Sequence, residues 1–140
     1  MSNEIAMKLW KDVFGNKEWA QDCFGTWIKK GDYGVYDRKR VRPNGDGKKY
    51  HYGWDVDHIR PVSSFSDESD ADFYNNYEPM HRNNNQQKSD DYTHFTVRDK
   101  KYKVVNCDVC STKNMKGYGI ADVRTGKRVD WKGVQRRSYK

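Results

Sequence analysis

The sequence predicts an α+β fold: an N-terminal helix, a β-hairpin, a short second helix and a small β-rich C-terminal extension. Three observations predict it. Apolar residues recur at helical spacing in residues 5–14, a turn segment separates two strand-like stretches near residue 45, and short strand-like segments dominate residues 96–140. A length of 140 residues allows one small domain with an appendage, which we place at residues 1–95 and 96–140.

The N-terminal helix is predicted from the spacing of Ile5, Leu9 and Val13, which places all three on one face. Ser2 suits the N-cap of this helix, and Gly15 suits its end. We expect the apolar face to pack against the rest of the domain.

The β-hairpin is predicted around the turn at residues 43–47, where Pro, Asn and Gly cluster. Residues 35–41 form the predicted first strand and residues 48–56 the returning strand, which runs on toward Pro61. Before the hairpin, we expect residues 16–34 to form short strands and turns.

The second half of the chain is predicted from weaker signals. Residues 63–74 are polar and acidic without periodicity, which indicates a loop, and residues 81–88 suit a short exposed helix after a brief extended segment at 76–79. The extension has three predicted strands, at residues 102–105, 120–123 and 128–131.

The composition predicts a thin, aromatic-rich core. Leu, Ile, Val and Phe together number only 22 residues, and the net charge is +7, which falls in the range of disordered chains. Five Trp and ten Tyr residues favour a folded domain instead, because each aromatic side chain buries a large area. A ligand that binds only the native state would stabilise such a core.

The positive charge is clustered, which favours a nucleic-acid partner over a generally solvated surface. Residues 98–140 hold 13 Lys and Arg against 4 Asp and Glu. Phosphate contacts are expected from a cluster before the hairpin turn and from the C-terminal segment, with a merely charged tail as the alternative. The residues are Arg38, Lys39 and Arg40, then Lys127, Arg128, Arg136 and Arg137.

The remaining composition favours a cytoplasmic protein with no membrane partner. No stretch approaches the roughly 18 apolar residues of a membrane helix, and the N-terminal residues lack the pattern of a secretion signal. Three cysteines suit a reducing compartment. Cys107 and Cys110 have zinc-ligand spacing, but no second such pair exists, so free thiols are favoured over a structural zinc.

Asp57 and His58 are candidates for phosphodiester hydrolysis, because a carboxylate stands beside an imidazole where a strand ends. An imidazole can deprotonate the attacking water, and a divalent cation can stabilise the charge on the phosphoryl and leaving oxygens. The carboxylate of Asp57 and the amide oxygen of Asn85 suit Mg²⁺. Asn76 could tie down the loop behind His58. Taken alone, an adjacent Asp–His pair would more often be a surface hydrogen-bonded pair.

The segment Asp57-His58-Ile59-Arg60-Pro61 resembles the D-H-I-x-P core of the HNH (ββα-metal, His-Me finger) nucleases. Asn76 stands where the family has its middle Asn, and Asn84-Asn85-x-x-Lys88 resembles the closing motif, in an HNN variant. Upstream, residues 22–34 and Tyr52-Gly53-Trp54 look like the D-C-x-G, Y-G and Y-G-W elements of small phage and bacterial members. The resemblance spans residues 20–92.

The resemblance implies a ββα-metal core at residues 50–92 within a nuclease domain over residues 1–95. It implies a metal-dependent endonuclease that cleaves DNA, with RNA as the second choice, and leaves 5′-phosphate and 3′-hydroxyl ends. His58 would be the general base, Asn76 would order its loop, and Asp57 and Asn85 would hold Mg²⁺ or Mn²⁺. No small-molecule cofactor is expected.

Three further residues near the motif are expected to contact phosphate, each with a structural alternative. Arg60 could instead pair with the acidic loop, Lys88 could fix the helix, and His81 could be structural. Two other functions stay open: a catalytically silent nucleic-acid-binding or regulatory protein, and a toxin-like nuclease held by an acidic immunity partner.

Overall fold

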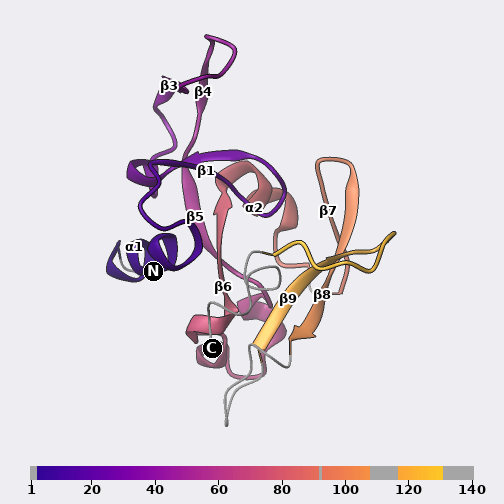
Figure 1. Ribbon diagram of the computed structural model, residues 1–140. Helices are drawn as coiled ribbons and strands as arrows, with labels where there is room; N and C mark the ends of the chain where they lie inside the picture. Colours follow the sequence, from indigo (N-terminus) through magenta and orange to yellow (C-terminus); the bar gives the residue numbers. More distant parts are fainter. Residues whose placement is uncertain (1–2, 92, 108–116, 131–140) are drawn as a thin grey trace.

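The computed structural model describes residues 3–91, 93–107 and 117–130 (Figure 1). Within these residues, nine strands form four small antiparallel sheets, and two α-helices accompany them. The predicted fold class, an α+β domain built on a ββα-metal core, is therefore wrong: small antiparallel sheets dominate, and no such metal core is shown. The strands are only three to eight residues long, because Gly, Pro and polar turns interrupt the apolar runs, so each strand pairs locally.

Three of the four sheets are two-stranded and one is three-stranded. The first three pair neighbouring strands: β1 (Trp19–Gln21) with β2 (Trp27–Lys29), β3 (Lys39–Val41) with β4 (Lys49–His51), and β5 (Trp54–His58) with β6 (Tyr77–His81). The last sheet has the order β7 (Phe95–Val97), β8 (Lys100–Cys107) and β9 (Gly117–Asp122).

The predicted N-terminal helix is confirmed as α1 (Asn3–Phe14). Its apolar face is buried, with Leu9 and Trp10 fully covered. The helix ends at Phe14, and the next residue, Gly15, has a φ of 69°, in the left-handed region that glycine adopts without strain. Neither described helix has the length and apolar character needed to cross a membrane.

The predicted strand over residues 48–56 divides into β4 and β5, which belong to different sheets. The division falls at Gly53, where a Cβ atom would lie 1.9 Å from the backbone oxygen of Val35. Only glycine allows two backbones to approach this closely. The chain therefore leaves the β3–β4 hairpin at this point and enters the β5–β6 hairpin.

The predicted loop over residues 63–74 is built largely from three short 3₁₀ turns, at Val62–Ser64, Glu68–Ala71 and Tyr74–Asn76. The chain then enters β6, which leads directly into α2 (Arg82–Lys88). The short exposed helix predicted at residues 81–88 is thus present, although its inner face is buried.

Two apolar clusters hold these elements together. The first packs α1 against β2, β5 and β6, with Trp10 and Trp54 rings 5.2 Å apart. The second joins Ile59 and Met80 to the β7–β8–β9 sheet and so crosses the boundary predicted at residues 95/96. Figure 1 shows α1 and this sheet on opposite sides of the β5–β6 hairpin and α2.

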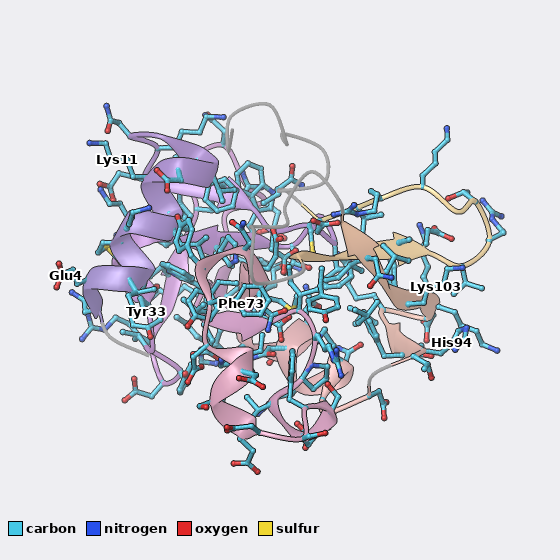
Figure 2. All side chains as sticks on the ribbon, turned by 90° about the horizontal axis from the view of Figure 1, so that it is seen from below. Glu4, Lys11, Tyr33, Phe73, His94 and Lys103 are labelled. Atoms are coloured by element: carbon cyan, nitrogen blue, oxygen red, sulfur yellow. The ribbon has the colours of Figure 1, made fainter. Side chains whose placement is uncertain are left out.

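The placement of α1 and the β7–β8–β9 sheet on opposite sides is also visible from below. Figure 2 shows Glu4 and Lys11 on α1 at one side of the molecule, and Lys103 and His94 at the other. Phe73 lies between these two sides, where it packs against the second cluster. The acidic loop, residues 63–74, therefore lies next to the β7–β8–β9 sheet.

Candidate active site

A pocket of about 140 Å³ lies where β5 ends beside α2. Asp57 and His58 enter it from β5, and Asn85 enters it from α2. Three of the four residues expected to act in catalysis or metal binding thus line one pocket. Apolar side chains and polar residues after α2 complete its walls: Val56, Pro61, Val62, Ser89 and Asp90.

The orientation of α2 is fixed by the buried carboxylate of Asp22. Its Oδ2 atom accepts hydrogen bonds from the backbone N–H of His81 (2.9 Å) and from the Asn84 side chain (2.8 Å). Its Oδ1 atom accepts from the backbone N–H groups of Phe24 and Thr26. Burial raises the pKa of Asp22, and these four hydrogen bonds oppose that effect. Of the neighbouring asparagines, Asn84 is therefore structural.

Asp57 is buried, with 4% of its surface exposed. Its oxygens lie 3.3 and 3.4 Å from Nζ of Lys88, which is fully buried, and Nζ also donates to the backbone oxygen of His58 at 3.1 Å. Burial raises the pKa of Asp57, while the ammonium of Lys88 opposes that rise. This pair joins α2 to the end of β5, which leaves Lys88 no access to a phosphate.

His58 is held in place by an acceptor that the sequence analysis missed. Its Nε2 lies 2.8 Å from Oδ1 of Asp72, and its ring meets Tyr77 edge-on at 5.4 Å. Since a carboxylate only accepts hydrogen bonds, Nε2 carries a proton, and in the neutral ring the lone pair is then on Nδ1. The His58 side chain is 24% exposed. The neutral imidazole therefore has a defined tautomer, and its side chain is partly open to solvent.

Asn76 lies behind the pocket and closes the loop that follows His58. Its amide group donates to the backbone oxygens of Arg60 (3.1 Å) and Ala71 (3.0 Å), and its side-chain oxygen accepts from the Arg60 backbone N–H. Its own backbone oxygen accepts from Ile59. Asn76 thus contacts backbone, and its effect on His58 is exerted through the loop.

All three residues near the motif that are expected to contact phosphate have internal partners. Arg60 donates to Ser64 and to the hydroxyl of Tyr118, with its guanidinium over Phe65. His81 is buried and caps α2 by accepting from the Asn83 N–H. These two side chains, like Lys88, hold the framework of the site.

The two basic clusters farther from the motif, within residues 38–40 and 127–137, contain both paired and exposed side chains. Arg40 pairs with buried Asp32, and Arg128 pairs with buried Asp130. Of the same set, the side chains that remain exposed are Arg38, Lys39 and Lys127. Arg136 and Arg137 lie outside the described residues, as does Cys110 of the cysteine pair.

The donor set of the pocket suits one hard cation that keeps much of its water. The described residues contain no group of three or more His, Cys, Asp or Glu side chains able to hold a metal. However, Asp57 Oδ2 is buried and has no hydrogen bond, and Asn85 adds a neutral oxygen to the same pocket. One carboxylate and one amide oxygen fit Mg²⁺, which usually retains several waters. Lys88 would share Asp57 with such an ion.

Comparison with family models, curated proteins and solved structures gives no match for this chain. The function must therefore be inferred from the chemistry of the pocket and its surroundings. Within the sequence, only the surplus of carboxylates in the loop before Asn76 could have indicated that one of them, Asp72, contacts His58.

Proposed function

We propose that the protein is a metal-dependent endonuclease that hydrolyses phosphodiester bonds in DNA. The observation that carries this proposal is the single pocket lined by Asp57, His58 and Asn85. The contact between His58 Nε2 and Asp72 supports it, because the contact leaves Nδ1 as a base.

In the proposed reaction, Nδ1 of His58 takes a proton from a water molecule as the water oxygen attacks phosphorus. The bond from phosphorus to the 3′-oxygen breaks, and this oxygen takes a proton from solvent, which leaves 5′-phosphate and 3′-hydroxyl ends. Asp57 and Asn85 would hold a divalent cation, Mg²⁺ or Mn²⁺, which supplies charge stabilisation for the phosphoryl and leaving oxygens. Asp72 orients the base, and Asn76 keeps the loop closed behind it.

The direct experiment is incubation of the purified protein with supercoiled plasmid in Mg²⁺ or Mn²⁺, with EDTA as the control. Conversion to nicked or linear DNA in the metal but not in EDTA is the expected result. The protein should form ends that DNA ligase rejoins, because ligase requires a 5′-phosphate and a 3′-hydroxyl. Intact plasmid in every metal would contradict the proposal.

A catalytically silent nucleic-acid-binding protein is the second candidate, and the ion pair between Asp57 and Lys88 favours it. The ammonium compensates the carboxylate in the absence of a metal ion, so the charge of Asp57 does not by itself require one. Binding of DNA without cleavage in the plasmid experiment would identify this alternative.

Asp72→Asn is expected to lower the cleavage rate about 10- to 100-fold, because the base would lose its orienting carboxylate. The thermal midpoint should stay near that of the wild type, since the Asp72 side chain is 61% exposed. Steady-state cleavage rates and a thermal melt measure the two effects. Asp70→Asn, an exposed carboxylate in the same loop, is the matched control and should cleave normally. Equal rates for both variants would remove Asp72 from the mechanism.

A further inference from the structure

A groove of about 660 Å³ lies between the β3–β4 hairpin, the turn after β1 and one edge of α2. The hairpin extends away from the body of the molecule at the top of Figure 1. The walls of the groove carry five cationic side chains and one carboxylate, apart from its two histidines. These residues are Lys39, Arg42, Lys48, Lys49 and Arg98, with Asp46 as the carboxylate.

The lysines of the groove have no ion-pair partner among the residues that the structure describes. Within the described part of the chain, Lys39, Lys48 and Lys49 form no ion pair and are exposed. Asp46, the one carboxylate on the described walls, accepts from the hydroxyl of Tyr50 and from the Lys48 backbone N–H within the hairpin. The groove therefore has a strong positive field, which attracts a polyanion.

Two of the cations are held in position. The guanidinium of Arg42 lies 4.0 Å from the centre of the Trp27 ring, and that of Arg98 donates to Thr26 at 3.1 Å. The backbone N–H of Arg98 donates to the side chain of Gln87 on α2. Neither arginine forms an ion pair among the described residues, although Asp46, whose pKa is lowered chiefly by the Tyr50 hydroxyl, also responds to the nearby charge of Arg42. Both guanidinium groups can therefore still reach phosphate oxygens.

Arg98 occupies a position that favours a different residue. It lies in the turn between β7 and β8 with a φ of 51°, and Asp99 follows with a φ of 67°. Turns with two left-handed residues favour Asn and Gly. The arginine therefore has a cost for local stability, which is consistent with a role for its side chain in the groove.

The groove and the catalytic pocket border the same exposed face of α2. Successive residues of a helix are about 100° apart, so Asn83 and Gln87, which line the groove, lie on one side of exposed Gln86, and Asn85 lies on the other. The two openings are separated by about one helix diameter, roughly 10 Å. A duplex carries one charge per about 1.7 Å of its axis, so DNA across α2 would present several phosphates between them.

Charge, more than base stacking, dominates this groove. Tyr52 is only 6% exposed, one face of Trp27 is covered by Arg42, and Tyr50 at 45% is the one Tyr or Trp side chain on the described walls that is largely exposed. Single strands bind on successive aromatic platforms, which are absent from these walls. The chemistry therefore favours the backbone of a duplex.

We infer that this groove binds the phosphate backbone of double-stranded DNA next to the bond that the pocket would cleave. The inference rests on the proposed function for its substrate, but binding can be measured without cleavage. The groove would supply affinity that does not depend on base sequence, while the pocket supplies the chemistry.

The test is the fluorescence anisotropy of a short labelled duplex, titrated with full-length protein in EDTA at several salt concentrations. Lys48→Gln with Lys49→Gln should weaken binding roughly tenfold and reduce the salt slope by about 1 to 2. The matched control is Lys11→Gln with Lys17→Gln, which removes the same charge from exposed positions in and just after α1. This control should bind nearly as the wild type does.

Arg98→Asn provides a second variant that the turn geometry favours, so binding should fall while the thermal midpoint stays the same or rises. Equal effects of the groove and α1 lysine pairs would overturn the inference, as would tighter binding of the single strand than of the duplex. Groove-dependent binding without cleavage in Mg²⁺ would support the groove and contradict the nuclease proposal. Cleavage that does not depend on the groove lysines would support the nuclease proposal and contradict the role of the groove.

Discussion

Replacing His58 with alanine should lower the rate of DNA cleavage by about 10²- to 10⁴-fold, the range typical of a lost general base. The variant lacks the one imidazole among the described residues that line the pocket, where Asp57 is compensated by Lys88 and Asn85 has a non-basic amide. Affinity for DNA in EDTA should be unchanged, because the ring lies outside the positive groove. Single-turnover cleavage of a supercoiled plasmid measures the first effect and anisotropy the second.

His94→Ala is the matched control, because it removes an exposed histidine just before β7, away from the pocket. It should cleave at the wild-type rate. The same rate in His58→Ala would exclude His58 as the base, and a parallel loss of DNA affinity would indicate that the ring binds substrate instead. A loss in cleavage alone supports the role proposed for Nδ1.

The features that sequence predicted well are those determined by short-range pattern. The spacing of Ile5, Leu9 and Val13 determines which face of α1 is buried, and Gly15 determines where the helix ends. The turn at residues 43–47 likewise joins the paired strands β3 and β4. In these cases a few residues close together in the sequence determine the local conformation.

The prediction of the fold class was wrong because strand pairing depends on contacts between distant residues, which the local sequence pattern does not show. Residues 48–56 alternate between large apolar or aromatic residues and other residues, as a single strand would, but Gly53 allows the chain to cross Val35 closely and change sheets. The sequence also cannot show that Met80 and Ile59 would pack against the last sheet across the predicted boundary.

Charged residues were the least predictable part of the site. A count of arginines gives the net charge, but not whether each guanidinium faces solvent or a buried partner. Arg40 and Arg128 each form an ion pair with a buried carboxylate, and Arg60 donates a hydrogen bond to the hydroxyl of Tyr118, 58 residues away. The cations that remain exposed in the groove became evident only once these internal partners were known.

The largest expected effect on stability comes from Lys88→Met, which should destabilise the protein by about 3–5 kcal/mol near pH 7. Lys88 is fully buried, and its ammonium is the ion-pair partner of Asp57. Methionine fills similar space but leaves a buried carboxylate uncompensated. Urea unfolding at about pH 7 measures the change, and Lys17→Met, at an exposed position, should alter stability by less than about 0.5 kcal/mol.

The loss in Lys88→Met should shrink as the pH falls. Burial raises the pKa of Asp57, and Lys88 is the strongest influence that opposes this rise, so the variant should have a still higher pKa at Asp57. A carboxyl whose pKa is higher in the folded than in the unfolded state favours folding when protonated; stability is retained below the unfolded value and is lost as the pH rises through the folded one. Unfolding at about pH 5 should therefore show a smaller difference from the wild type than at about pH 7.

Adding Asp57→Asn to Lys88→Met should recover most of the loss near pH 7, because no buried charge remains. The same deficit at both pH values would mean that the lost contact with the His58 carbonyl, rather than the uncompensated carboxylate, destabilises the variant.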